Sequence, residues 1–141
     1  MRVVFDTNVI IDAVASREPF AKDAQMLLEK AAENAFQGFL TANSLTDIYY
    51  VVRRNLSEEE ACHILYVLLL SLEIIGVNSN ECWRALDLKI GDYEDSLLVI
   101  CAESVAADLI VSRDTGLLTA KLSIPVYSPE ALVTSGMFSG E

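Results

Sequence analysis

Five aspartates recur along the chain, each of them just after an apolar run or in the first turn of a helical segment. Carboxylates crowded together raise one another's pKa, so a bare cluster of them is unfavourable. A hard divalent cation removes this conflict, and Mg²⁺ is commonly held by one or two carboxylates, with water and substrate phosphate completing its ligands. Two such ions would make a site for phosphodiester hydrolysis. The five are Asp6, Asp47, Asp92, Asp95 and Asp114.

Helix capping is an alternative explanation for each of these acids taken singly. An Asp at a helix N-terminus accepts hydrogen bonds from free backbone N–H groups and complements the helix dipole. Residues 44–47 and 92–95 both have the spacing of a capping box. Asp6 and Asp95 fit capping least well, because both adjoin apolar residues and a partly buried carboxylate needs a partner. Both interpretations stay open at this point.

The elements that position these acids follow from the hydrophobic pattern. Short apolar runs predict strands at residues 3–5, 38–41, 73–77, 109–112 and 125–127. Helical spacing and capping signals predict helices at 8–15, 20–36, 44–55, 58–72, 81–89, 93–106 and from 128. This alternation predicts an α/β fold, a mostly parallel central sheet of four to five short strands with helices on both faces in three layers. The acids would then meet at the carboxyl edge of the sheet, where ligands bind in such folds.

Length and composition indicate a single folded domain. The 141 residues, 52% of them apolar, suffice for one hydrophobic core. No linker or repeat divides the sequence, so we expect one domain over residues 1–133 and a polar tail at 134–141. The three cysteines have no CxxC spacing, and no apolar run is long enough to cross a bilayer. A cytoplasmic protein without membrane contact is therefore expected.

The charge and the histidine content exclude several function classes. Ten Lys and Arg against 21 Asp and Glu give a formal net charge of −11. This excludes a protein that coats DNA through a basic surface, whereas an acidic site can engage phosphates through bound cations. The single histidine, His63, lies among helix formers, so Ser-His-Asp and Cys-His catalysis are poorly supported.

Three motifs, in order, resemble those of the PIN (PilT N-terminus-like) domain family. Residues 3–9, VVFDTNV, are similar to its opening, in which a strand ends in Asp followed by Thr or Ser and then Asn. Residues 92–98, 101–102 and 107–114 resemble its second half, and residues 124–130 resemble its usual ending. The resemblance spans most of the chain, although between residues 25 and 89 only Ser44 and Asp47 carry it.

The resemblance implies a metal-dependent endoribonuclease that hydrolyses phosphodiester bonds in RNA, such as the VapC-like toxins of type II toxin–antitoxin pairs. Its cofactor would be Mg²⁺ or Mn²⁺, since hard oxygen ligands suit both. The partners implied are an RNA substrate, a protein antitoxin and further copies of the chain, as a homodimer or higher homo-oligomer. Carried over residue by residue, the acids that bind metal and catalyse the reaction are Asp6, Asp47, Asp95 and Asp114, with Asp6 and Asp95 as the principal ligands.

Further residues are expected to support these acids. Thr7, Asn8 and Ser112 would hold them by hydrogen bonds, and Asp92 and Glu94 are possible additional acids. The chain departs from the family pattern in two ways. Asp47 stands where the family often has the longer Glu, and Thr115 follows Asp114 where an aromatic residue is common.

Four basic residues are candidates for contacts with RNA phosphate, because Arg and Lys supply most such contacts. For the two arginines in the helix at 44–55, an exposed helix end that complements the dipole is an equal alternative. The four are Arg53, Arg54, Arg113 and Lys121.

The helix at 58–72 carries six consecutive apolar residues, 65–70, which cannot all face one core. One side would be buried against a second subunit, and the alternative is a helix enclosed within the domain.

Two other function classes compete with the nuclease. A non-catalytic PIN-like module that binds nucleic acid or protein is the main alternative, although the complete set of four acids speaks against it. An aspartyl-phosphate phosphatase also begins with a strand that ends in Asp. That chemistry requires a second acid two residues later, where this chain has Asn8.

Overall fold

A single parallel sheet organises the computed structural model, which describes residues 1–139. The strand order is β3–β2–β1–β4–β5, and every neighbouring pair is parallel. The predicted α/β fold with a parallel central sheet is confirmed, with five strands. They are β1 (Arg2–Phe5), β2 (Gln37–Thr41), β3 (Glu73–Ile75), β4 (Leu109–Val111) and β5 (Val126–Tyr127).

Eight helices connect and cover these strands in the described part of the chain. Seven were predicted from the sequence, whereas the helix at residues 115–119 was not. Its sequence, TGLLT, is too short to show a helical period. The eight are α1 (Thr7–Val14), α2 (Ala21–Ala32), α3 (Ala42–Asn55), α4 (Glu58–Ser71), α5 (Ser79–Leu88), α6 (Tyr93–Ser104), α7 (Thr115–Thr119) and α8 (Pro129–Thr134).

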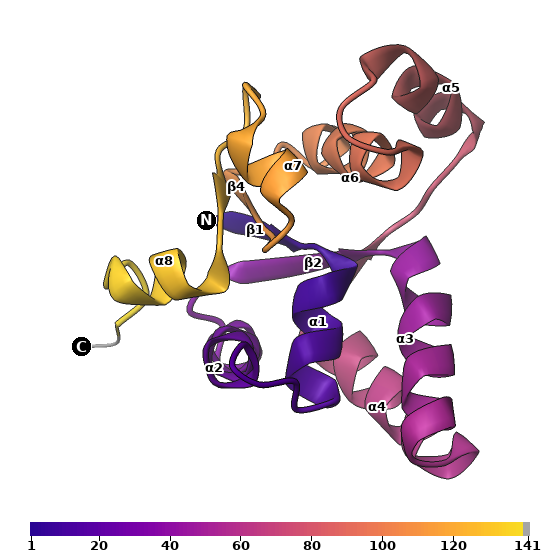
Figure 1. Ribbon diagram of the computed structural model, residues 1–141, viewed down its shortest axis with the longest axis vertical. Helices are drawn as coiled ribbons and strands as arrows, with labels where there is room; N and C mark the ends of the chain where they lie inside the picture. Colours follow the sequence, from indigo (N-terminus) through magenta and orange to yellow (C-terminus); the bar gives the residue numbers. More distant parts are fainter. Residues whose placement is uncertain (140–141) are drawn as a thin grey trace.

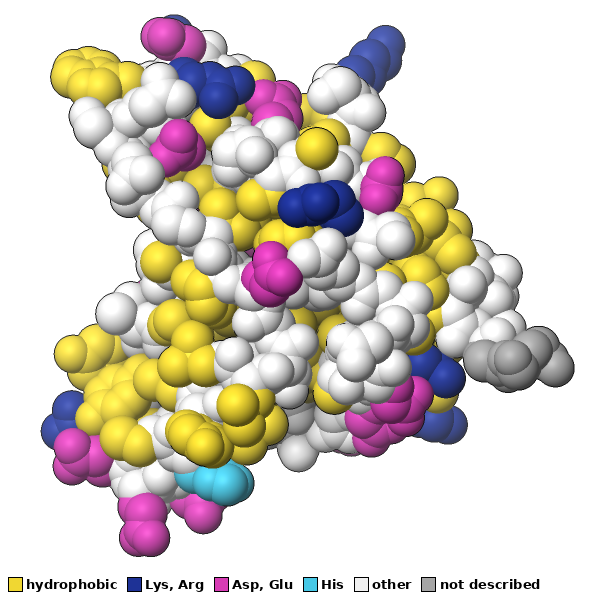
Figure 2. Space-filling view, turned by 180° about the vertical axis from the view of Figure 1, so that it is seen from behind, with side chains coloured by type: hydrophobic (Ala, Val, Ile, Leu, Met, Phe, Trp, Pro, Cys, Tyr) yellow, Lys and Arg dark blue, Asp and Glu magenta, His cyan; other side chains and the backbone are white. Residues whose placement is uncertain are grey.

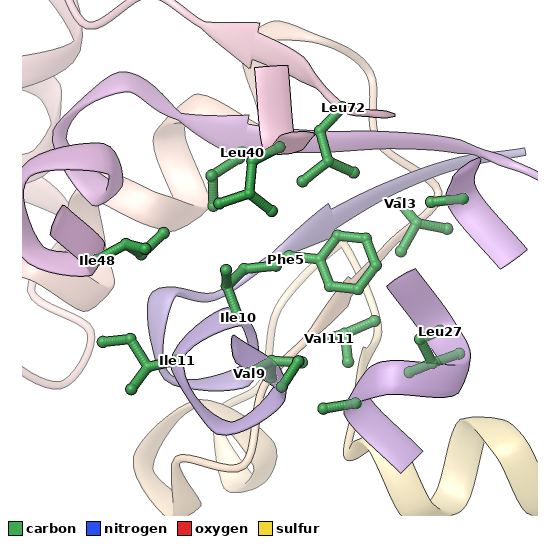
Figure 3. Close-up of a cluster of buried hydrophobic side chains, with 14 of the residues drawn as sticks. Val3, Phe5, Val9, Ile10, Ile11, Leu27, Leu40, Ile48, Leu72 and Val111 are labelled. Atoms are coloured by element: carbon green, nitrogen blue, oxygen red, sulfur yellow. The ribbon is translucent and has the colours of Figure 1, made fainter. Parts of the chain in front are cut away.

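The helices form one layer on each face of the sheet (Figure 1). Successive strand residues point to opposite faces. Phe5 and Val111 pack against residues of α1 to α4 and α8, as Figure 3 shows for much of this cluster. Val4 and Ile110 pack on the other face against α5, α6 and α7. Because both faces are buried, the strands read as continuous apolar runs rather than alternating ones.

The strand order reverses at β1, and this reversal positions the candidate site. The chain builds β2 and β3 on one side of β1, and then crosses over to build β4 and β5 on the other. In open parallel sheets the crevice for ligands lies outside the carboxyl ends of the strands at this reversal. Asp6 directly follows β1, and Ser112 and Asp114 follow β4, so the fold brings all three to the crevice.

Helix α4 is not enclosed within the domain, so that alternative is wrong. Only Ala61 and Leu68 of this helix are buried. Four of the consecutive apolar residues are exposed, with Leu70 at 73%. In Figure 2, apolar side chains gather at the lower left of the molecule, over α3 and α4. The exposed four are Tyr66, Val67, Leu69 and Leu70.

The expected tail is described as far as residue 139, and residues 140–141 lie outside the described part. Within the tail the Phe138 ring packs against the Phe36 ring, with centroids 4.4 Å apart, so this segment contacts the domain. Among residues 1–139, no helix is both long and apolar enough to cross a membrane.

Candidate active site

Acidic side chains from four segments meet at the carboxyl edge of the sheet, where their charges help to raise the pKa of three of them, Asp6, Glu94 and Asp95. The charges of Asp114 and Asp92 raise the pKa of both Asp6 and Asp95. Burial, and then the charges of Asp47, Asp6 and Asp92, raise the pKa of Glu94. Each of the four predicted metal-binding acids and both additional acids thus lies within electrostatic range of at least one other.

Asp6 is the most enclosed of these acids, at 7% exposure. Burial is the main cause of its raised pKa, and the Asp114 and Asp92 charges add to it. Two hydrogen bonds act in the opposite direction and favour the ionised form. The Ser112 hydroxyl donates to Asp6 Oδ2 over 2.7 Å, and the backbone of Thr7 provides the other. A cation at this position would relieve the remaining cost of the buried charge.

Ser112 connects Asp6 to the loop after β4. Its side chain is fully buried, and besides donating to Asp6 it accepts the backbone N–H of Asp114 over 3.0 Å. Asp114 in turn caps α7, with its Oδ1 accepting the Gly116 N–H over 2.9 Å. Ser112 therefore supports two of the acids, as the sequence predicted for a hydrogen-bonding residue.

Asp95 combines a capping role with a strongly perturbed carboxyl group. It forms a capping box with Asp92, in which Asp92 Oδ1 accepts the Asp95 N–H over 2.8 Å and Asp95 Oδ2 accepts the Asp92 N–H over 3.3 Å. Even so, burial and then the Asp114 and Asp92 charges raise the pKa of Asp95 to about 7. The capping explanation is therefore correct for Asp92, Asp95 and Asp114, yet the cap alone does not stabilise the Asp95 charge.

Gly91 leaves the space that the Asp95 carboxylate occupies. Its φ is +58°, in the left-handed region, and a Cβ built at this position would overlap Asp95 Oδ2. The absence of a side chain at Gly91 thus gives the Asp95 carboxylate its place at the start of α6.

Thr7 and Asn8 were expected to hold the acids by hydrogen bonds, but in residues 1–139 neither side chain bonds to an acid. The Thr7 hydroxyl lies 2.6 Å from the Ser44 hydroxyl, which lies 2.7 Å from that of Thr41. This buried chain fixes the start of α1 against the start of α3. Asn8 Oδ1 is buried and has no hydrogen-bond partner among the described residues.

A groove beside the acids contains residues that the sequence reasoning missed. It encloses about 380 Å³ and is lined from α1, α3, the segment after α1 and the start of α6. The predicted residues Asp47, Arg54 and Glu94 line it, together with Arg17 and Tyr50, which were not predicted. The spacing of Asp47, Tyr50 and Arg54 puts them on one helix face and could have indicated Tyr50. Nothing local to Arg17 could have indicated its position.

The other basic candidates lie elsewhere. Arg113 forms an ion pair with the fully buried Asp12, at 2.5 Å from Nε and 3.1 Å from its second nitrogen. Its guanidinium also covers the Phe20 ring at 4.2 Å, so its charge is already matched within the domain. Arg53 and Lys121 are exposed and do not line the groove.

The donors present suit a hard cation that keeps part of its water. They are carboxylate oxygens at the carboxyl edge, from Asp6, Asp95 and Asp114. Within residues 1–139, no three His, Cys, Asp or Glu side chains are arranged to hold an ion by themselves.

Comparison with known proteins identifies relatives of this chain. The family described as "PIN domain" matches residues 2–116. Ribonuclease VapC1 of Aquifex aeolicus (strain VF5) is 25% identical over 128 residues, covering 87% of this chain and 88% of that protein.

Two solved structures share the fold. VapBC2 from Rickettsia felis, bound to a DNA fragment from its promoter, has a TM-score of 0.70 and 19% identity, covering 91% of this chain and 98% of that one. A toxin–antitoxin complex from Klebsiella pneumoniae has a TM-score of 0.66 and 20% identity, covering 90% of this chain and 97% of that one.

Proposed function

The chain belongs to the PIN domain family, and we propose that it is a divalent-metal-dependent endoribonuclease that acts as the toxin of a type II toxin–antitoxin pair. The observation that carries this proposal is that Asp6, after β1, and Asp95, at the start of α6, converge on Asp114 at the carboxyl edge of the sheet. Both have raised pKa values and both lie within reach of the Asp114 charge, at the strand reversal. A strongly perturbed titratable group with a specific charged neighbour is typical of a functional site.

The relatives support the substrate class and the partner. The similar protein from Aquifex aeolicus is named a ribonuclease, and the similar structure from Klebsiella pneumoniae is a toxin–antitoxin complex. We therefore assign RNA as the substrate and a protein antitoxin as a partner. Cleavage of RNA and inhibition by that antitoxin are properties to be measured on this chain.

Different residues of the chain would have different roles in the proposed reaction. Asp6, Asp95, Asp114 and Asp47 would hold Mg²⁺ or Mn²⁺, with Asp92 and Glu94 nearby. The bound ion supplies a water of lowered pKa and positive charge for the phosphate. Ser112 orients Asp6 and favours its ionised form. The Thr7–Ser44–Thr41 chain fixes α1, which carries Asn8, against α3, which carries Asp47.

Titration of Mn²⁺ and Mg²⁺ into the wild type, Asp6→Asn and Asp95→Asn tests the metal site. We expect measurable binding to the wild type and its loss in both variants, because each removes an anionic oxygen ligand. Asp87→Asn is the matched control, since Asp87 is exposed on α5, and it should bind as the wild type does. Cleavage of single-stranded RNA by the wild type and Asp87→Asn, and not by Asp6→Asn, then tests the activity.

Two results would contradict the proposal. If Mn²⁺ and Mg²⁺ do not bind even with single-stranded RNA present, the acids serve as helix caps and the chain is a binding module. If Asp6→Asn still cleaves RNA, the assignment of Asp6 is wrong.

A further inference from the structure

The groove beside the acids lies between α1 and α3, which contact each other and both lead away from the carboxyl edge of the sheet (Figure 1). α1 begins directly after β1, and α3 begins directly after β2. The groove therefore starts at the candidate active site and extends outward from it. Its volume of about 380 Å³ falls within the range of roughly 300–1,000 Å³ typical of ligand sites.

The groove is acidic at one end and basic at the other. Asp47, Tyr50 and Arg54 follow one another on the same face of α3, and seven residues of helix place Arg54 about 10 Å beyond Asp47. On the facing side, Asn8 lies in the first turn of α1, and Arg17 lies beyond its end. Asp47 and Asn8 thus mark the end at the active site, and the two arginines mark the far end.

Arg17 and Arg54 are available to an anionic ligand. Among residues 1–139, the basic residues that form ion pairs are Lys30, Arg84 and Arg113. Arg17 and Arg54 form none, and both are exposed. The chain has a net charge of −11, yet two guanidinium groups without ion pairs line the same groove. Guanidinium groups match phosphate geometry with two parallel hydrogen bonds.

Tyr50 lies between the acidic and basic ends. Its side chain is 57% exposed, and the edge-to-face contact with Tyr49, at 5.2 Å between centroids, helps to fix the ring. An exposed ring in a groove provides a surface on which a nucleic-acid base can stack. Bases are free to stack on a side chain in single strands and loops, whereas a duplex keeps them within its own stack.

We propose that this groove binds the single-stranded RNA that flanks the cleaved bond, with a base stacked on Tyr50 and backbone phosphate held by Arg17 and Arg54. The inference rests on the proposed function and adds the residues that hold the substrate. Stacking accepts any base, so the groove selects unpaired RNA rather than a sequence. The basic end compensates for the acidic end, which repels phosphate wherever no cation intervenes.

Binding measured apart from cleavage tests this inference. Asp6→Asn, which retains the groove, is titrated with a fluorescein-labelled single-stranded RNA, and fluorescence anisotropy gives the affinity. Adding Tyr50→Ala should weaken binding roughly 5- to 150-fold, the range found for loss of one stacked base. Adding Arg17→Ala and Arg54→Ala should lower the slope of log affinity against log salt by about 0.7 for each phosphate that the protein no longer neutralises.

Matched variants separate stacking and charge from damage to the fold. Tyr50→Phe keeps the ring and should retain the affinity, and Arg54→Lys should retain part of the salt dependence. Lys22→Ala removes an exposed charge on α2, away from the groove, and should change neither the affinity nor the salt slope. Thermal unfolding of each variant confirms that it is folded.

The outcomes distinguish this inference from the proposed function. If Tyr50→Ala and the double arginine variant bind RNA as the parent does, or if the parent binds no RNA, the groove assignment is wrong. Equal affinity for duplex RNA of the same sequence also overturns it. If the wild type cleaves RNA and the groove substitutions, made in the wild type, leave its KM for RNA unchanged, the groove assignment is wrong and the nuclease assignment stands. If the groove variants weaken RNA binding while the wild type cleaves nothing, the groove stands and the nuclease assignment fails.

Discussion

The raised pKa of Asp95 makes the stability of the metal-free protein depend on pH. Its pKa in the folded state is about 7, against about 3.9 in an unfolded chain. Between these values the folded state binds more protons than the unfolded state, so its stability falls as pH rises. We expect the melting temperature of the metal-free protein to decrease from pH 5 to pH 8, with the raised pKa of Asp6 adding to the effect.

Asp95→Asn provides the comparison for this pH prediction, because the amide oxygen can still accept the Asp92 N–H. The variant should show a flatter decrease and a higher melting temperature than the wild type at pH 8. Addition of Mn²⁺ at pH 8 should stabilise the wild type by binding only the folded state, and should leave the variant nearly unchanged. Identical pH profiles for the two proteins would show that Asp95 is not perturbed.

Ser112→Ala tests the hydrogen bonds that hold Asp6 and Asp114. The change removes the donor to Asp6 Oδ2 and leaves the Asp114 N–H without its acceptor. We expect Mn²⁺ affinity, measured by titration calorimetry, to fall about 10- to 100-fold, as is usual when a group that orients a metal ligand is removed. Stability should decrease by about 1–3 kcal/mol. Ser104→Ala, which removes a hydroxyl bonded only to the Cys101 carbonyl, should leave the affinity intact; an equal loss there would contradict the prediction.

The residues of the site differ in how far the sequence alone could identify them. The acids were identifiable because each follows an apolar strand or opens a helix, and these local signals fix their place at the edge of the sheet. Arg113 was expected to contact phosphate, but it pairs with Asp12. The two residues are 101 positions apart in the sequence, and only the packing of α1 beside β4 brings them together.

At the scale of the element, the start of α6 depends on Gly91. A side chain at this position would clash with the Asp95 carboxylate, so Gly91→Ala should displace that carboxylate and weaken Mn²⁺ binding at least tenfold. The left-handed backbone adds a cost of about 1–2 kcal/mol. Gly136→Ala is a close control, because φ there is +72° and the nearest atom lies 3.6 Å from the added Cβ. It should lose similar stability and keep its Mn²⁺ affinity, and equal affinities in the two variants would contradict the role given to Gly91.

The sequence predicted the strands and most of the helices and missed other features. Central strands were predicted because burial on both faces leaves a continuous apolar run, and α4 was predicted from the capping-box sequence at residues 57–60, of which the structure forms one half: the Ser57 hydroxyl accepts the Glu60 N–H. Helix α7 was missed because five residues make little more than one turn. The groove was missed for another reason. One wall of the groove is the face of α3 that carries Asp47, Tyr50 and Arg54. The opposite wall comes from α1, and no pattern within the α3 sequence shows that α1 lies beside it.

At the scale of the whole molecule, the exposed apolar face of α4 predicts self-association. We propose that Tyr66, Leu69 and Leu70, which are 64%, 52% and 73% exposed, pack against the same face of a second copy, since contiguous exposed apolar patches mark interaction sites. Light scattering at micromolar concentration should then give twice the chain mass of 15.5 kDa. Leu70→Glu places a charge in that contact and should give the monomer mass with an unchanged melting temperature at low concentration. Leu86→Glu makes the same change at a residue of α5 that is 52% exposed, and it should remain dimeric. A monomeric wild type, or a dimer that survives Leu70→Glu, would show that this face serves another partner.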